Sequence, residues 1–217
     1  MVKLLNVSYR YQGTGGVENV TFEIGPNDFI LLVGKTGAGK TTILKLISME
    51  LSPKSGEITL EHMKSSELKS RKLPEWRRRI GIVYQDFRLL GDRSVLENVK
   101  LTAACQPNLQ GSPKLRAVRA LGKVGITHKL HNIPGELSTG EQQRTALARA
   151  LVNEPYVLLA DEPVSNLDSE TSSGIVELLQ RANQMGTAML IATHQPERFS
   201  SCNPRVLVIE RGHLREQ

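Results

Sequence analysis

The sequence predicts an α/β protein built on a mostly parallel β-sheet, with a smaller antiparallel sheet near the N-terminus. Alternating apolar and polar residues at 4–9 and 20–24 indicate two antiparallel strands. A glycine-rich loop leads into a helical pattern at 41–47, which favours a strand–loop–helix unit. Continuous apolar runs, typical of strands buried on both faces of a parallel sheet, span residues 29–33, 156–160, 188–192 and 206–209.

The chain length favours a single domain. Its 217 residues are enough to bury a sizeable core, and the chain has no long linker or internal repeat. The pattern in the middle of the chain is mostly helical. We therefore expect one domain over 1–217, in which residues 1–86 and 155–217 form the sheet core and residues 87–154 an inserted helical subdomain.

Composition limits the possible partners and compartments. Cys105 and Cys202 fit no metal-ligand pattern, which favours reduced thiols in the cytosol. No apolar run is long enough to cross a bilayer, and no signal-peptide pattern follows Met1, so we expect a protein kept in the cytosol that docks on a membrane partner.

The net charge of +6 has three interpretations: a nucleic-acid patch, attraction to an anionic membrane surface, or a solvated basic face. We favour the solvated face and expect no nucleic acid, because four Phe, four Tyr and one Trp offer little material for base stacking. The basic residues gather at Lys69, Arg71, Lys72, Arg77, Arg78 and Arg79.

The loop after the run at 29–33 has the spacing of a phosphate-binding loop, Gly-x4-Gly-Lys-Thr. Its glycines let backbone N–H groups point at phosphate oxygens, and the following helix adds the positive end of its dipole. Lys40 is expected to bridge the β- and γ-phosphates as a catalytic group, and the Thr41 hydroxyl to ligate Mg²⁺. A glycine-rich turn that merely caps a helix is the alternative. The expected nucleotide-binding residues are Gly34, Lys35, Thr36, Gly37, Ala38, Gly39, Lys40, Thr41 and Thr42.

A pair of carboxylates, Asp161 and Glu162, follows the apolar run at 156–160. Ligands bind at the carboxyl ends of the strands in open parallel sheets. We expect Asp161 to hold Mg²⁺ through water and Glu162 to polarise the attacking water as general base. Two solvated acids at a strand end are the alternative, which the phosphate loop disfavours.

A helix is predicted to begin at Ser138. Ser138 and Glu141 have the spacing of a capping box, and apolar residues follow at helical spacing. The stretch LSTGEQQR at 137–144 contains more characteristic residues than a helix cap alone requires. With it, the chain resembles the ATP-binding-cassette ATPases, whose signature motif this stretch matches.

The resemblance covers essentially the whole chain and implies a P-loop fold with a RecA-like parallel core. It implies ATP and Mg²⁺ as ligands, hydrolysis of ATP, and a homodimer that closes on ATP. In this family the signature helix of one subunit presents its N-terminus to the γ-phosphate held by the other. The signature residues expected to do so here are Ser138, Gly140 and Glu141.

Further family positions are matched by order and spacing. Tyr11 matches the aromatic residue that stacks on adenine, and Gln85 matches the Q-loop glutamine, which reaches Mg²⁺ and links the site to the helical subdomain. Residues 165–168 resemble the D-loop. His194 resembles the switch histidine that contacts the γ-phosphate and is expected to be catalytic.

Three residues depart from the family pattern. Thr139 replaces a glycine of the signature, Glu141 replaces the more common glutamine, and Gln195 stands where an acid is frequent. None of these changes removes a reacting group, so hydrolysis of ATP is still expected. An ATP-gated binding module with little hydrolysis and a soluble ATPase acting on nucleic acid are the alternatives.

Within the family, residues 73–90 and 92–99 look like the cell-division members, although the lipoprotein-release and macrolide-export ATPases share much of this stretch. The resemblance implies a peripheral protein at the cytoplasmic face of the bacterial inner membrane. It also implies an FtsX-like permease as integral membrane partner, through which ATP-driven closure regulates cell-wall hydrolysis during septation.

Two lesser patterns are each compatible with two interpretations. His128 and His131 have helical spacing but no third ligand nearby, so a solvated pair is favoured over a metal site. The apolar pairs at 89–90 and 95–96 either line a groove for the partner or pack inside the helical region.

Overall fold

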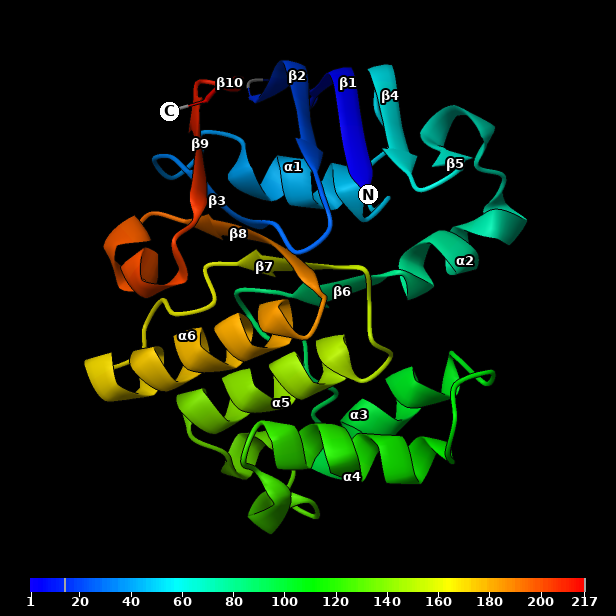
Figure 1. Ribbon diagram of the computed structural model, residues 1–217, viewed down its shortest axis with the longest axis vertical. Coiled ribbons are helices and arrows are strands. Elements are labelled where there is room, and N and C mark those ends of the chain that lie inside the picture. Colours follow the sequence, from blue (N-terminus) through cyan, green and yellow to red (C-terminus); the bar gives the residue numbers. More distant parts are fainter. Residues whose placement is uncertain (14, 217) are drawn as a thin grey trace.

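The computed structural model describes residues 1–13 and 15–216. Two β-sheets enclose helix α1 between them, and the other long helices lie on the opposite side of the larger sheet (Figure 1). The strands are β1 (Val2–Arg10), β2 (Gly16–Ile24), β3 (Phe29–Val33), β4 (Ser55–Leu60), β5 (Met63–Lys64), β6 (Ile80–Val83), β7 (Val157–Asp161), β8 (Ala188–Thr193), β9 (Arg205–Glu210) and β10 (His213–Glu216). The helices are α1 (Lys40–Ile47), α2 (Leu73–Arg78), α3 (Val95–Ala104), α4 (Pro113–Lys123), α5 (Thr139–Leu151) and α6 (Ser169–Gln184).

The larger sheet has six strands in the order β10-β9-β3-β8-β7-β6. Its five strands from β9 to β6 are parallel, and β10 adds an antiparallel edge. Leu31 of β3 lies opposite Ile191 of β8 and Val206 of β9. The four apolar runs predicted as strands are confirmed as β3, β7, β8 and β9. Every residue of β8 is buried, whereas β9 is buried only at Leu207 and Ile209, because it lies next to the edge strand β10.

Strand β6 was not predicted from the sequence. It is only four residues long, and Gly81 interrupts its apolar pattern. A Cβ on Gly81 would lie 2.5 Å from the backbone oxygen of Ala150 in α5. The glycine therefore lets α5 pack closely on this edge of the sheet, a requirement that local sequence does not reveal. β4, β5 and β10 were missed as well.

The smaller sheet has the order β2-β1-β4-β5, and the predicted antiparallel pair near the N-terminus is confirmed. Leu4 of β1 lies opposite Phe22 of β2 and Ile58 of β4. The buried Leu4 alternates with the exposed Lys3, as expected for a sheet with one wet face.

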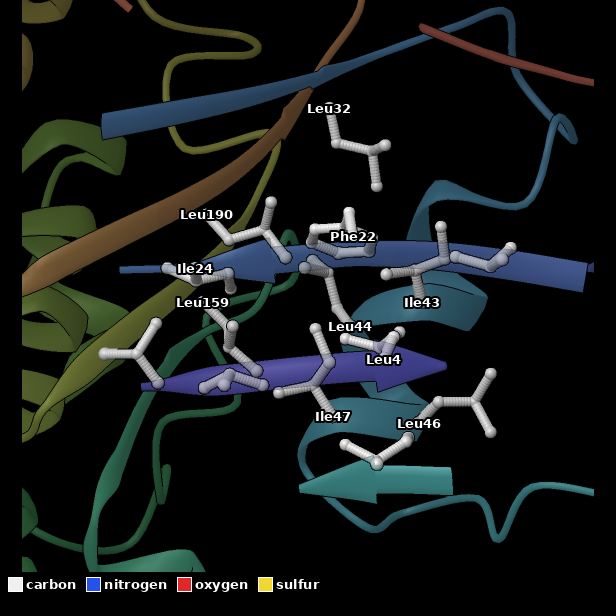
Figure 2. Close-up of a cluster of buried hydrophobic side chains, with 14 of the residues drawn as sticks. Leu4, Phe22, Ile24, Leu32, Ile43, Leu44, Leu46, Ile47, Leu159 and Leu190 are labelled. Atoms are coloured by element: carbon white, nitrogen blue, oxygen red, sulfur yellow. The ribbon is translucent and has the colours of Figure 1, made fainter. Parts of the chain in front are cut away.

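Helix α1 fills the space between the two sheets. Figure 2 shows its apolar side chains among those of the strands: Ile43, Leu44, Leu46 and Ile47 lie with Leu4, Phe22, Leu159 and Leu190. None of these side chains is more than 7% exposed, and burying each one stabilises the fold by about 1.5–3 kcal/mol. This packing fixes the N-terminus of α1, where Lys40 and Thr41 lie.

The region from 87 to 154 contributes α3, α4 and α5, which lie with α6 on the far side of the larger sheet (Figure 1). Val99, Leu121 and Leu147 are fully buried in the apolar cluster between these helices and the sheet. The division into a sheet core and an inserted subdomain at these borders stays a proposal. Among the described residues, no helix is both long and apolar enough to cross a membrane. Cys105 and Cys202 are free thiols.

Candidate nucleotide-binding site

The candidate site lies where β3, β7 and β8 end side by side. A cavity of about 360 Å³ opens at this edge of the sheet, between the loop after β3 and the ends of the other two strands. It is lined by Tyr11, Gly15, Gly16, Lys35, Thr36, Gly37, Gly39, Lys40, Thr41, Thr42, Gln85, Asp161, Glu162 and His194. The structure therefore brings predicted residues from five separate parts of the chain to one place.

Two of the predicted phosphate-loop residues lie beneath the loop and do not line the cavity. The Ala38 side chain is buried. A Cβ on Gly34 would meet the backbone oxygen of Ile209 on β9. Gly37 and Gly39 have positive φ angles of 80° and 114°, which glycine adopts without strain. The loop thus needs glycine for close packing at 34 and for backbone conformation at 37 and 39.

Lys40 is held at the floor of the cavity. Its side chain is 7% exposed, and its Nζ donates to the backbone oxygens of Gly34 at 2.7 Å and Lys35 at 3.4 Å. The same Nζ lies 3.6 Å from Oε1 of Glu162. A buried ammonium with an opposite charge and two carbonyl acceptors is well compensated in this structure.

Asp161 and Thr41 form the second contact between the loop and the strand ends. The Thr41 hydroxyl donates to Oδ2 of Asp161 at 2.7 Å. Burial is the main cause that raises the pKa of Asp161 above its ordinary value; the bond from Thr41 opposes this shift and the charge of Glu162 adds to it. A hydroxyl and a carboxylate so close together are hard oxygen donors of the kind that Mg²⁺ prefers, so the residues present fit this ion.

Glu162 lies between two potential proton or charge partners. Oε1 of Glu162 lies 2.9 Å from Nδ1 of His194, and the backbone N–H of His194 donates to Oε2 at 3.4 Å. The φ angle of Glu162 is 48°, in the left-handed region that an ordinary residue adopts only at some cost. The backbone turn aims this carboxylate into the cavity, beside Lys40 and His194.

Tyr11 and Gln85 also line the cavity. Tyr11 is 38% exposed, its ring contacts Tyr9 edge-on at 5.0 Å, and its hydroxyl lies 3.4 Å from the Thr42 hydroxyl. Gln85 lines this cavity and also a neighbouring cavity of about 490 Å³, which extends to Glu50. An exposed ring is available for stacking on a base, whereas Gln85 lies at the junction of the two cavities.

The signature residues are absent from the lining of this cavity. Ser138 is the N-cap of α5, and the predicted capping box is confirmed: the Ser138 N–H donates to Oε2 of Glu141 at 2.8 Å, and the Glu141 N–H donates to the Ser138 hydroxyl at 3.3 Å. The bond from the Ser138 backbone is the main cause that lowers the pKa of Glu141. His128 Nε2 and Lys129 Nζ each lie 3.6 Å from Oε1 of this carboxylate.

His128 lies beside Glu141, and the interpretation of His128 and His131 as a solvated pair stays a prediction. No cluster of three metal-binding side chains is found among the residues that the structure describes. The apolar pairs at 89–90 and 95–96 differ in burial. Val95 is fully buried in the apolar cluster of the helical region, whereas the Leu90 side chain is 45% exposed.

The start of α5 is packed against the start of α6. Asp168 caps α6 by accepting from the Thr171 N–H at 2.8 Å and from its hydroxyl at 2.7 Å. A Cβ on Gly140 would lie 2.6 Å from Cγ2 of Thr171. Gly140 is therefore needed for this contact, which joins the signature stretch to the segment at 165–168.

The sequence did not point to Arg149, which ties α5 to the segment after Gln85. Its guanidinium donates to the backbone oxygens of Phe87 and Arg88, both at 2.5 Å. These two consecutive residues have positive φ angles of 57° and 46°. The only sequence signal was a cation at helical spacing, which is common on any helix. Arg149 thus holds an unfavourable backbone turn directly beside the candidate site.

Comparison with known proteins agrees with this arrangement. Residues 17–165 match the model of the family described as ABC transporter. The cell division ATP-binding protein FtsE of Escherichia coli strain K12 is 41% identical over 215 residues, which cover 99% of this chain and 97% of that protein. FtsE of Bacillus subtilis strain 168 is 37% identical over 213 residues, which cover 98% of this chain and 93% of that protein.

Solved structures give the same similarity. The dimeric structure of MJ0796, a bacterial ABC transporter cassette, matches with a TM-score of 0.91 and 32% identity, covering 100% of this chain and 98% of that one. A dimeric post-hydrolysis state of the same cassette, bound to ADP and phosphate, matches with a TM-score of 0.90 at the same identity and coverage.

Proposed function

We propose a role in cell division for this chain, which belongs to the ABC transporter family of ATP-binding cassettes. The chain is an ATPase, the ATP-binding subunit of an ABC-type complex. We propose that two copies close around ATP on the cytoplasmic side of a membrane, that an FtsX-like permease is the integral partner, and that the cycle regulates cell-wall hydrolysis at the septum. The observation that carries the proposal is that Ser138 and Gly140 lie outside the cavity formed by their own subunit.

In the proposed binding mode, the phosphates lie on the loop at 34–41 with the ring of Tyr11 against the adenine. The Lys40 ammonium turns from its backbone acceptors and from Glu162 towards the β- and γ-phosphates, because a triphosphate offers it more negative charge. Thr41 and Asp161, with Gln85 at the junction of the cavities, would hold Mg²⁺. When bound, this ion neutralises phosphate charge and orients the γ-phosphate.

The proposed chemistry uses Glu162 as the proton acceptor. In this structure its carboxylate is engaged by Lys40 and His194, 3.6 and 2.9 Å away. Once the phosphates take over Lys40, the Glu162 carboxylate has one cationic neighbour fewer and can accept the proton of the attacking water. His194 then donates to the γ-phosphate oxygens from the other side.

The proposed dimer places the N-terminus of α5 of one subunit at the γ-phosphate of the other. Its N–H groups and helix dipole favour an anion, and the Ser138 hydroxyl adds a donor. Glu141 does not oppose this, because Lys129 and His128 lie beside its carboxylate. Two-fold symmetry makes two such sites at one interface.

Mixing two inactive variants tests this arrangement. Lys40→Ala removes the phosphate-binding half of a site, and Ser138→Ala removes the signature half. A mixed dimer has one site with both defects and one intact site, so an equimolar mixture should regain about a quarter of wild-type ATPase activity if the sites act independently. The control is the Lys40→Ala variant assayed alone at the same total protein concentration.

If the mixture is no more active than its two components, and ATP causes no dimerisation in size-exclusion chromatography, the shared-site proposal is wrong. ATP-dependent dimerisation without phosphate release would instead favour an ATP-gated module.

The cell-division role has its own test. Replacing the chromosomal copy with Glu162→Gln should leave cells elongated or chained, with the protein still recovered on membranes together with its permease partner. Normal septation in these cells would contradict the role in division, even if the ATPase activity stands.

A further inference from the structure

A second large groove lies on the face of the molecule remote from the candidate nucleotide site. We call it the α4–α6 groove; its volume is about 1010 Å³, and it is bounded by α4, the end of α5, the second half of α6 and the loop before β8. Its lining includes Arg119, Lys123, Leu151, Tyr156, Leu178 and Met185. A space of this size, open along one side, fits a chain segment better than a small metabolite.

The groove and the nucleotide cavity lie at opposite ends of the same strands. Pro155, Tyr156, Gly186 and Thr187, which precede β7 and β8, line the groove. The residues at the other ends of these strands, Asp161 and His194, line the nucleotide cavity. At roughly 3.3 Å per residue, the five residues of β7 separate the two by about 15 Å. A ligand in the groove therefore does not compete with ATP or with the proposed dimer contact at Ser138.

The floor of the groove is apolar and partly open to solvent. Met185 is 68% exposed and Tyr156 is 54% exposed, and both are among the most exposed large apolar side chains of the described residues. Leu151 and Leu178 are half-buried beside them. Large apolar side chains gathered in one hollow are typical of a binding surface rather than of solvated protein.

The rim of the groove is basic. Arg119 and Lys123 are exposed on α4, and within residues 1–13 and 15–216 neither makes an ion pair with a carboxylate. Arg181 pairs with Glu177 on its own exposed helix surface, at 3.4 Å. Glu154 is the one acidic residue in the described lining.

The positive charge continues beyond the groove. An adjoining hollow of about 320 Å³ shares Pro155 with it and adds Arg77 and Arg78. Lys123 and Arg181 lie in the last turns of their helices, where cations complement the helix dipole. That effect does not account for Arg119, which lies a turn earlier, or for the exposed apolar floor.

We propose that the α4–α6 groove is a docking site for an acidic amphipathic helix of a second protein. An apolar stripe would cover Met185, Tyr156 and Leu151, and carboxylates on its flanks would meet Arg119 and Lys123. The hollow shape suits a helix about 10 Å wide better than a lipid surface. Because the groove holds the C-terminal ends of α5 and α6, an occupant would touch the same helices whose N-caps are Ser138 and Asp168.

The test uses a labelled model peptide of about 18 residues, with Leu at positions i, i+3, i+4 and i+7 and Glu elsewhere, added to the full chain. Fluorescence anisotropy should report binding that weakens as salt rises from about 0.05 to 0.3 M. The double variant Arg119→Glu/Lys123→Glu should weaken binding at least about tenfold, a loss of about 1.4 kcal/mol. Hydrogen exchange should show protection at 119–124, 151–156 and 181–187.

The matched control is Lys100→Glu/Lys114→Glu, which makes the same charge change on exposed helix positions outside the groove. It should bind the peptide within about twofold of wild type in this assay. ATPase activity of both double variants should equal that of the wild type.

Equal weakening by the two double variants would overturn the proposal, because binding would then follow net charge alone. So would equal binding of a peptide with Lys in place of Glu. Tighter groove-dependent binding of anionic lipid vesicles or of a single-stranded oligonucleotide would assign the groove to a membrane or a nucleic acid instead. Self-association that the groove variants abolish would assign it to a second copy.

Discussion

The phosphate-loop cavity and the start of helix α5 are built in opposite ways. The cavity gathers residues from five separate parts of the chain, and its polar and charged side chains contact one another: Lys40 with Glu162, Glu162 with His194, and Asp161 with Thr41. The start of α5 is stabilised locally, because the side chains of residues 138 and 141 each accept a hydrogen bond from the backbone N–H of the other.

This difference in construction predicts how each region responds to ATP. In the cavity, a phosphate must replace contacts that already exist, so binding and rearrangement are coupled. At the start of α5, the helix N-terminus is formed in advance and needs only to be brought to an anion. The cavity should therefore be sensitive to changes of charge, and the α5 start to changes of shape.

The largest expected effect concerns the charge of Glu162. Glu162→Gln keeps the shape of the side chain but removes the proton acceptor, so the ATPase rate should fall by about 10²–10⁴-fold. ATP binding should persist, and the ATP-bound dimer should accumulate. Phosphate release and analytical size-exclusion measure the two effects. A rate equal to that of the wild type would remove Glu162 from the chemistry.

A smaller effect is expected at Arg149, which ties the last turn of α5 to the segment after Gln85. Arg149→Ala removes two hydrogen bonds to the Phe87 and Arg88 carbonyls, which should lower the free energy of unfolding by about 2 kcal/mol and Tm by about 4–8 °C. The ATPase rate should fall while the Kd for ATP changes little.

Arg149→Lys is the control, because it keeps the positive charge but lacks the planar, forked donor geometry of a guanidinium, and it should give an intermediate result. Equal losses of ATP affinity and rate would mean that Arg149 supports the cavity itself.

At Gly140, steric crowding rather than charge should decide the effect of a substitution. Alanine normally stabilises a helix by about 1 kcal/mol relative to glycine, but here its Cβ would lie 2.6 Å from Cγ2 of Thr171. Gly140→Ala should therefore cost about 1–2 kcal/mol of stability, measured by urea unfolding. Adding Thr171→Ser removes that methyl group, keeps the hydroxyl that bonds Asp168, and should restore most of the loss.

Gly135→Ala serves as the comparison for Gly140→Ala, since nothing lies within 4 Å of a Cβ built there. If both substitutions destabilise equally, crowding against Thr171 is not the cause.

The smallest effect concerns Asp161 in the nucleotide-free protein. Because burial raises its pKa in the folded state above the unfolded value near 3.9, the native state holds the proton more tightly, and stability falls as pH rises from about 4 through the folded-state pKa. Asp161→Asn should thus raise Tm at pH 7 by about 2 °C.

The Tm difference for Asp161→Asn, followed by calorimetry, should shrink as the pH falls towards 4, because the raised pKa favours the protonated wild-type carboxyl at low pH. A constant difference at all pH values would show that the hydrogen bond with Thr41, not the charge, is responsible.

Some elements were predictable because their causes are local. The strands β3, β7, β8 and β9 have apolar runs, and the capping box needs only two residues three positions apart, Ser138 and Glu141. β6 was missed because Gly81 breaks its pattern in order to admit α5, and Arg149 was missed because nothing nearby in sequence shows which carbonyls it reaches. The roles of the cavity residues stay predictions.

The amino-acid sequence by itself determined the phosphate loop, the helix start at Ser138 and the parallel core, since each depends on residues within a few positions of one another. Only the tertiary structure decided that Glu162 lies between Lys40 and His194, and that Ser138 lies outside the cavity of its own subunit. Distances across a sheet depend on strand order and register, and these follow from the packing of the whole chain around α1.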